Sequence, residues 1–150
     1  MQKIAKDRPL AEITLRRYEK PFQMERRELV RKLCLSIGLL QPGDSRDVVV
    51  DVLQVILDAK TPLDAEAIII GVKKNREERG IILLGIAPSN IRRQLKRIKD
   101  MMLIEKAGTT YRLTENMTPI QIFEEKIEKY LVASVIERTK EYFMALEHKD

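Results

Sequence analysis

One segment constrains the fold of this chain more than any other, because it couples an amphipathic helix directly to a β-hairpin. At 100° per residue, four apolar side chains fall within an arc of about 60°, the stripe expected of a helix that lies on a core: Ile91, Leu95, Ile98 and Met102. The opposite side carries one hydroxyl group and four cations: Ser89, Arg92, Arg93, Lys96 and Arg97. This side of the helix therefore projects positive charge and almost no acid.

Two short strand-like segments follow this helix at once, Leu103 to Lys106 and Tyr111 to Leu113. The residues between them include Gly108, whose backbone tolerates the conformations of a tight turn. A β-hairpin is the simplest interpretation of residues 103–114. The expected fold class is therefore mainly α with a small β-hairpin.

Positive charge is concentrated in the same region. The whole chain has 28 Lys and Arg residues against 23 Asp and Glu, a net charge of +5, but residues 87–112 alone hold 7 basic and 2 acidic groups. Residues 1–43 also have a net charge of +5, whereas 44–86 and 113–150 have net charges of −2 and −3. An anionic partner is therefore expected to contact the segment 87–112.

Three further helices are predicted before this segment. Apolar residues recur at intervals of three and four over 24–37, and Gly38 is placed to end that helix. The stretch Val48 to Leu57 is nearly all apolar and β-branched, which alone would favour a strand. We nevertheless predict a buried helix over 45–59, because polar residues recur there about once per helical turn: Asp51, Gln54 and Asp58.

The third of these helices is predicted over 62–79. Thr61 can cap it, Pro62 suits the first helical position, and Asp64 completes a capping box. The apolar run Ile81 to Ile86 that follows is too short for a core helix, so we expect a buried connection or a short strand.

A long C-terminal helix is predicted from Thr118-Pro119, with Gln121 at the third helical position, to about Glu147. At 1.5 Å per residue it would be about 43 Å long. Its apolar surface is too large for a solitary exposed helix, so it requires a partner, and a homodimer is expected. The residues predicted for the dimer interface are Phe123, Ile127, Tyr130, Leu131, Val135, Tyr142, Phe143 and Leu146.

Helices over 45–59, 62–79 and 88–101, followed by a hairpin over 103–114, resemble the winged helix-turn-helix domain of DNA-binding regulators. The segment from Ser89 to Thr114 carries most of the resemblance. It is similar to a recognition helix and wing, with a Ser start, the paired arginines Arg92 and Arg93, and a Leu-Ile-Glu exit into the hairpin. The sequence differs from the family pattern at Gly80 to Ala87, because this segment is longer than the usual short turn between the second and third helices.

The resemblance implies a winged-helix domain over 44–114 with an added N-terminal helix and a long C-terminal helix. Residues 1–23 would form an N-terminal arm, 24–43 an N-terminal helix and turn, and 115–150 a dimerisation helix. Such an arrangement is similar to that of small dimeric winged-helix regulators of bacteria and archaea. A composition with few Asn and Gln beside abundant Ile, Glu, Lys and Arg is also typical of heat-adapted proteins.

The function implied by the resemblance is that of a transcriptional regulator that binds double-stranded DNA. DNA offers a dense line of phosphates to cations and a major groove wide enough for one helix. Winged helices also serve as protein docking modules, so a scaffold that does not touch DNA stays an alternative, as does an RNA-binding protein. The residues implied to contact DNA are Ser89, Asn90, Arg92, Arg93, Lys96 and Arg97 in the helix and Lys106, Thr109, Thr110 and Arg112 in the hairpin.

The sequence offers little for catalysis or cofactor binding. One cysteine and one histidine cannot supply a four-ligand zinc site, so we expect no metal, no cofactor and no enzymatic activity. Cys34 lies on an apolar stripe and is predicted to be a core residue rather than a redox sensor. The sequence shows neither a secretory signal nor an apolar run long enough to span a bilayer, so a soluble cytoplasmic protein is expected.

Overall fold

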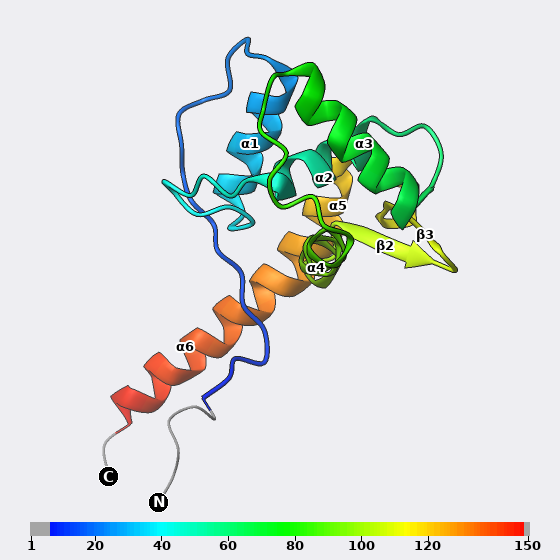
Figure 1. Ribbon diagram of the computed structural model, residues 1–150. Helices are drawn as coiled ribbons and strands as arrows, with labels where there is room; N and C mark the ends of the chain where they lie inside the picture. The colour runs from blue at the N-terminus through cyan, green and yellow to red at the C-terminus, as the bar shows by residue number, and fades with distance from the viewer. Residues whose placement is uncertain (1–6, 149–150) are drawn as a thin grey trace, which may run out of the picture.

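The computed structural model describes residues 7–148, and these residues are mainly helical with a small three-stranded antiparallel sheet (Figure 1). The strands are β1 (Leu63–Asp64), β2 (Ile104–Ala107) and β3 (Thr110–Leu113). The helices are α1 (Arg26–Ser36), α2 (Val48–Asp58), α3 (Ala65–Glu78), α4 (Pro88–Asp100), the 3-10 turn η2 (Thr114–Asn116), α5 (Pro119–Ile122), the π-helical segment η3 (Phe123–Val132) and α6 (Ala133–Glu147). None of the helices within 7–148 is long and apolar enough to cross a membrane.

Helix α2 is covered on several sides because nearly all of its side chains are apolar. A helix that is apolar all round is stable only when other elements bury it. Helices α1, α3 and α4 all pack against α2, and Val50, Val52 and Leu53 are fully buried. The structure confirms the predicted buried helix, in place of the strand that β-branched residues alone would favour.

Polar side chains of α1, α2 and α3 meet where these three helices pack together. They form the Asp51 cluster, which consists of Arg27, Asp47, Asp51, Gln54, Asn75 and Arg76. The fully buried Asp51 carboxylate accepts hydrogen bonds from Arg27 Nε at 2.9 Å and from Arg76 Nη1 at 2.7 Å. Asn75 Nδ2 donates to the same carboxylate at 2.8 Å. Asp47, at the start of α2, pairs with both arginines at 3.1 Å. The cluster therefore ties three helices together at one point.

The two arginines keep Asp51 ionised inside the protein. Burial raises the pKa of Asp51, but hydrogen bonds from Arg27 and Arg76 lower it by more, so the pKa lies below its ordinary value. Burial lowers the pKa of Arg27, and its bonds to Asp51 raise it by more. Within residues 7–148, no buried side-chain nitrogen or oxygen lacks a hydrogen-bond partner. The buried charges are therefore fully paired, as a stable core requires.

Helix α3 begins at Ala65 rather than at Pro62. The Asp64 carboxylate caps it by accepting a hydrogen bond from the Ala67 backbone N–H at 2.8 Å. Leu63 and Asp64 form β1 and pair with β3, so the start predicted from Thr61 and Pro62 is wrong. The physical reason is the pairing of these residues with a distant strand, which holds them extended.

The predicted hairpin is confirmed by β2 and β3, which pair Glu105 with Arg112 and Ala107 with Thr110. The addition of β1 beyond β3 gives the strand order β1-β3-β2. The sheet therefore has one strand more than the two that the sequence predicts.

The apolar run from Ile81 to Ile86 is not a strand, and most of it is not buried. Ile82 and Leu84 are 68% and 64% exposed, so the predicted buried connection is wrong. Polar contacts hold the segment instead: the Ile81 N–H donates to the Arg76 carbonyl at 2.9 Å, and Arg76 Nε donates to the Ile82 carbonyl at 2.9 Å. A backbone held in this way does not need to bury its apolar side chains.

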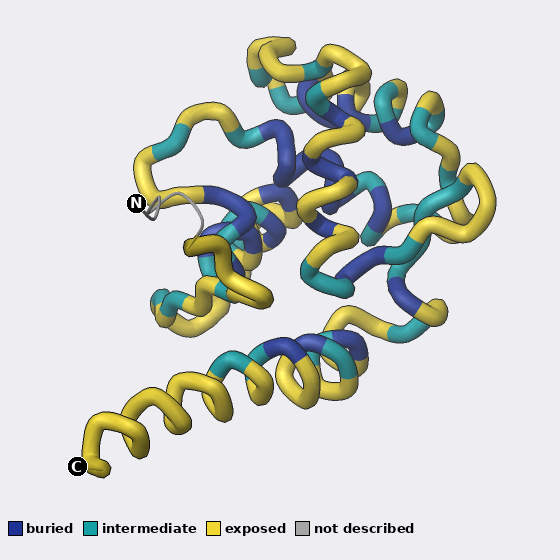
Figure 2. Tube along the Cα trace, turned by 90° about the horizontal axis from the view of Figure 1, so that it is seen from below, coloured by how far each residue is buried: buried dark blue, intermediate teal, exposed yellow. Residues whose placement is uncertain are grey.

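The C-terminal helix begins as predicted. The Thr118 hydroxyl accepts from the Gln121 N–H at 3.3 Å, and the Gln121 side chain accepts from the Thr118 N–H at 3.0 Å, which is a capping box. The helix then continues through η3 and α6 to Glu147. Figure 1 shows α6 extending away from the body, and Figure 2 shows that the C-terminal helix changes from partly buried in η3 to mostly exposed in α6.

Two residues predicted for the dimer interface lie in the interior of the same chain. Ile127 and Leu131 are 1% and 9% exposed, and Phe123 is partly buried against the core. The prediction is wrong for Ile127 and Leu131, because both lie on the side of η3 that the rest of the chain covers. Further along the helix, the other predicted residues remain at least partly accessible: Tyr130, Val135, Tyr142, Phe143 and Leu146.

Residues 7–25 form an arm without helix or strand that lies along α1. Arg16 holds it there, since its Nη1 donates to the Leu35 carbonyl at 2.8 Å and its backbone N–H donates to the Ser36 carbonyl at 2.8 Å. The arm passes so close to Gly38, which has φ of +79°, that an added Cβ would stand 2.6 Å from Thr14 Cβ. A glycine is therefore required where the arm crosses the end of α1.

Removal of the central carboxylate should destabilise the fold strongly. Asp51→Ala leaves Arg27 and Arg76 buried with fewer anionic partners, and we expect a loss of about 3 kcal/mol in the free energy of unfolding. Urea unfolding followed by circular dichroism measures it. The control is Asp58→Ala, which removes an ion pair to Arg26 whose side chains are 45% and 53% exposed, so a loss under about 1 kcal/mol is expected. Equal losses in the two variants would contradict the central role of Asp51.

The same carboxylate should give the protein a specific acid sensitivity. Because the folded-state pKa of Asp51 is depressed, its contribution to stability is present above the unfolded-state value and is lost as pH falls through the folded value. Wild-type stability should therefore decline below about pH 4. Unfolding curves from pH 6 to about pH 2 should show a shallower decline for Asp51→Asn. An identical pH dependence in both proteins would contradict this assignment.

Candidate nucleic-acid interface

The buried side of α4 determines which of its residues face outward. Ile91, Leu95 and Ile98 are fully buried where α4 packs on α2 and α3, as predicted. Met102, the fourth residue of the predicted stripe, lies beyond the end of the helix with φ of +71°. The helix starts with Ala87 as its cap and proline at its first position. Packing of this stripe turns the cationic side of α4 toward solvent.

Three cations of α4 make neither an ion pair nor a side-chain hydrogen bond to another element within residues 7–148. Arg92 and Lys99 are exposed and make no side-chain hydrogen bond to the described residues. Arg93 is also exposed and donates only to Asn90 Oδ1, at 2.7 Å. Their charges are therefore available to an anion from outside the chain.

The remaining two cations of α4 are partly engaged. Lys96 pairs with Asp100 at 2.7 Å, but both side chains are more than half exposed, so the pair contributes at most about 1 kcal/mol. Arg97 donates to the Leu39 carbonyl at 2.9 Å and to Gln94 Oε1 at 2.7 Å. Arg97 is thus held against the body, whereas Lys96 can exchange Asp100 for another anion.

The hairpin residues predicted to contact DNA are only partly free. Lys106 and Thr109 are exposed, and Thr110 is half-buried. Arg112 pairs with Glu105 across the hairpin at 2.6 Å, so its charge is largely compensated.

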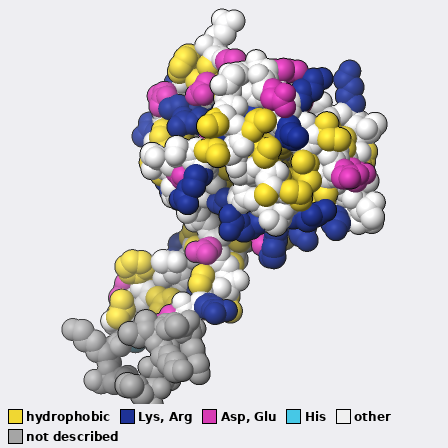
Figure 3. Space-filling model, in the orientation of Figure 1, with side chains coloured by type: hydrophobic (Ala, Val, Ile, Leu, Met, Phe, Trp, Pro, Cys, Tyr) yellow, Lys and Arg dark blue, Asp and Glu magenta, His cyan; other side chains and the backbone are white. Residues whose placement is uncertain are grey.

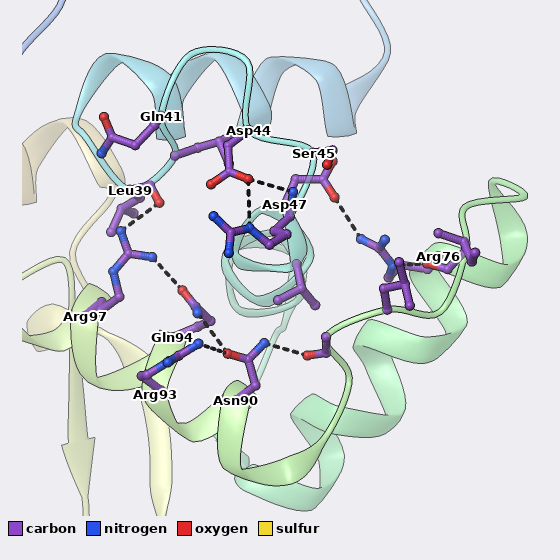
Figure 4. A pocket seen from close by; sticks show the side chains of 16 residues that line it. Leu39, Gln41, Asp44, Ser45, Asp47, Arg76, Asn90, Arg93, Gln94 and Arg97 are labelled. Carbon is purple, nitrogen blue, oxygen red and sulfur yellow. Dashed lines mark hydrogen bonds and ion pairs between the residues drawn. The ribbon is translucent and has the colours of Figure 1, made fainter.

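The structure brings the helix and the hairpin together at one place. Arg92 of α4 lines the same surface depression as Lys106 and Thr109 of the hairpin, with Asp64 and Glu66 also at its edge. On the other side of α4, Asn90, Arg93 and Arg97 border a cavity (Figure 4). The helical repeat places Ser89 and Lys96 between these two groups.

Figure 3 shows how these charges are distributed over one side of the molecule. Lys and Arg side chains gather along the lower part of the body, where α4 is seen end-on in Figure 1. Few acidic side chains lie among them. This side of the molecule therefore carries a concentration of positive charge near α4.

Lys99 is the residue of this region that the sequence analysis missed. It is exposed near the end of α4, seven residues or about two helical turns after Arg92, and so lies on nearly the same side of the helix. The same helical spacing that identified Arg92 and Lys96 also identifies Lys99, so the signal was present in the sequence.

Residues 7–148 contain no group of three His, Cys, Asp or Glu side chains placed to hold a metal ion. Cys34 is fully buried, and burial raises its pKa to about 12, so it is a protonated thiol at neutral pH. The structure confirms its prediction as a core residue.

The chain matches no protein-family model, no curated protein and no solved structure.

Proposed function

We propose that this protein binds double-stranded DNA through α4 and the β2–β3 hairpin, as a transcriptional regulator with a winged helix-turn-helix fold. The observation that carries the proposal is the group of exposed cations on α4, of which Arg92 lies beside the exposed hairpin residues Lys106 and Thr109. The order of α2, α3 and α4 followed by the β2–β3 hairpin supports it, since this is the order on which the resemblance to winged-helix domains rests.

The chemistry of the exposed residues fits a duplex. A helix that projects from the body can enter the major groove, and cations on both of its sides can then reach the phosphates that flank the groove. Arg92, Arg93 and Lys96 are in this position. Ser89 lies at the N-terminal end of α4, the end with which recognition helices usually approach base edges.

Two of the residues predicted to contact DNA must first release a partner within the chain. Arg97 would have to release the Leu39 carbonyl, and Arg112 would have to release Glu105. We therefore assign these two residues a smaller share of the affinity than Arg92, Arg93 and Lys96.

We also propose that α6 joins two copies of the chain. Val135, Tyr142, Phe143 and Leu146 recur at helical spacing along α6, with Ile136 beside them. Tyr142, Phe143 and Leu146 are 70%, 64% and 78% exposed, and α6 has no buried side chain. A second α6 offers the same stripe in return and so provides an apolar cover of matching length. A dimer would also present two α4 helices to DNA half-sites.

Removal of two cations from α4 should weaken DNA binding without loss of fold. We expect Arg93→Ala with Lys96→Ala to reduce affinity for random duplex DNA about ten-fold or more, because each phosphate contact contributes to affinity at low salt. The slope of log affinity against log salt concentration should become shallower by about two. Fluorescence anisotropy across a salt series measures both quantities.

The matched control for this double variant removes two cations from α1, which packs on α2 and lies outside the proposed DNA-binding surface. Arg26→Ala with Arg31→Ala removes the same formal charge and should leave the affinity nearly unchanged. Equal losses in both double variants would indicate non-specific attraction to net charge and would contradict the assignment of α4. Stronger binding to an RNA duplex at equal salt would favour the RNA alternative instead.

Charged substitutions in α6 should separate the two copies and leave each folded. Phe143→Glu with Leu146→Glu changes two exposed side chains, so the melting temperature followed by circular dichroism should stay unchanged. The molecular mass from light scattering should fall from that of a dimer to that of a monomer. Ile127→Glu serves as the contrast, because it places a charge in the core and should unfold the body. A wild-type protein that is monomeric at high concentration would overturn the dimer proposal.

A further inference from the structure

A cavity of about 650 Å³ opens between α4 and two connections of the chain (Figure 4). Its walls come from residues 39–48, which lead from α1 into α2, from residues 82–85 before α4, and from the first turns of α4 itself. This volume is within the range of about 300–1,000 Å³ that is typical of sites for small organic molecules.

The lining of the cavity combines five apolar side chains with ten polar or charged ones. Leu39, Leu40 and Val48 are buried in its floor, at 5%, 2% and 5% exposure. Ile82 and Leu84 also line it but are 68% and 64% exposed. A ligand with an apolar body would cover these two side chains, which the chain itself leaves in water, and their burial would favour binding.

The charged groups of the cavity leave a surplus of positive charge. Its two carboxylates are already engaged: Asp44 pairs with Arg46 at 3.2 Å, and Asp47 pairs with Arg76 at 3.1 Å. Arg93 and Arg97 have only neutral partners among residues 7–148. A guanidinium has five N–H donors, so both keep donors free for an anion.

The cavity is built into the fold rather than left between mobile segments. Arg76 Nε, from the Asp51 cluster, donates to the Ile82 carbonyl at 2.9 Å, and Asn90 Nδ2 donates to the Gly85 carbonyl at 2.8 Å. Gly85 has φ of +76°, which lets the chain turn into α4 at this point. On the opposite wall, Arg97 Nη2 donates to the Leu39 carbonyl at 2.9 Å. Each wall is therefore held by a hydrogen bond to its backbone.

We propose that this cavity binds a small organic anion, a carboxylate attached to an apolar body. The carboxylate accepts hydrogen bonds from the guanidinium groups of Arg93 and Arg97, in the charge-assisted geometry that arginine favours. The apolar body lies on Leu40 and Val48 and covers Leu84. An inorganic anion leaves the exposed side chains of Ile82 and Leu84 uncovered, and an organic cation meets the surplus positive charge, so neither fits the cavity as well.

Occupancy of the cavity has a consequence for α4. Arg93 is shared between this cavity and the proposed DNA-binding surface, so a bound carboxylate and a DNA phosphate compete for the same guanidinium. This consequence rests on the proposed function, whereas binding of the anion does not.

Binding is tested on the free protein with two probes that share a body and differ in charge, phenylbutyrate and phenylbutylamine. In methyl NMR spectra, phenylbutyrate should shift the resonances of Leu40, Val48 and Leu84 and leave Ile127 unmoved, while phenylbutylamine should shift none of these. The absence of shifts with phenylbutyrate at millimolar concentration, or equal shifts with the amine, would overturn the proposal.

Variants locate the anion within the cavity. Arg93→Gln should weaken phenylbutyrate binding about ten-fold, since it removes a charge-assisted hydrogen bond, whereas Arg92→Gln, outside the cavity, should not. Leu84→Ser should also weaken binding, and Leu83→Ser, which changes a neighbour that does not line the cavity, is its control. An equal effect of Arg92→Gln and Arg93→Gln would refute the assignment.

The consequence for DNA is measured separately. Saturating phenylbutyrate should reduce the DNA affinity of the wild-type protein by at least about five-fold and have less effect on Arg93→Gln. If the protein binds phenylbutyrate but not DNA, the proposed function is refuted and the proposed anion site in the cavity is supported. Unchanged DNA affinity with the probe bound would refute the competition.

Discussion

The fold depends on one buried carboxylate. Asp51 lies in the middle of the most apolar helix of the protein, where a lone charge would be prohibitive, and it is stable there only because Arg27 and Arg76 reach it from two other helices. Apolar packing alone would permit α1, α2 and α3 to slide against one another. Directional hydrogen bonds to a single buried group restrict them to one arrangement, because any other arrangement leaves a charge without a partner.

The influence of this cluster extends to the candidate sites through Arg76. The same guanidinium that pairs with Asp51 also holds the Ile82 carbonyl, and so determines where the chain runs between α3 and α4. That segment forms one wall of the cavity and leads directly into α4, where Asn90 holds it at Gly85. The position of α4, and with it the direction of its exposed cations, therefore depends on an ion pair in the core.

Local patterns predicted most of the helices correctly. The buried stripe of Ile91, Leu95 and Ile98, the Thr118 capping box and the hairpin at Gly108 all involve residues a few positions apart, and these interactions form within the element itself. The proposed DNA-contact residues follow from the same logic, since the side of α4 opposite a buried stripe faces solvent. The predictions that failed all involve contacts with a distant part of the chain: β1 and the start of α3, the burial of residues 81–86, and the role of Ile127 and Leu131.

The sequence by itself determined where helices and turns form and which side of α4 carries cations, because hydrophobic periodicity, capping and charge are local properties. Only the tertiary structure decided which apolar residues are covered. Ile127 is buried by the body of its own chain, whereas Phe143 and Leu84, equally apolar, remain exposed. Tertiary structure also decided that Asp51 is an internal partner rather than part of a solvated side. Burial and charge pairing depend on residues that are far apart in the chain. The spacing of neighbouring residues identifies an apolar side of a helix, but it does not show whether the same chain covers that side.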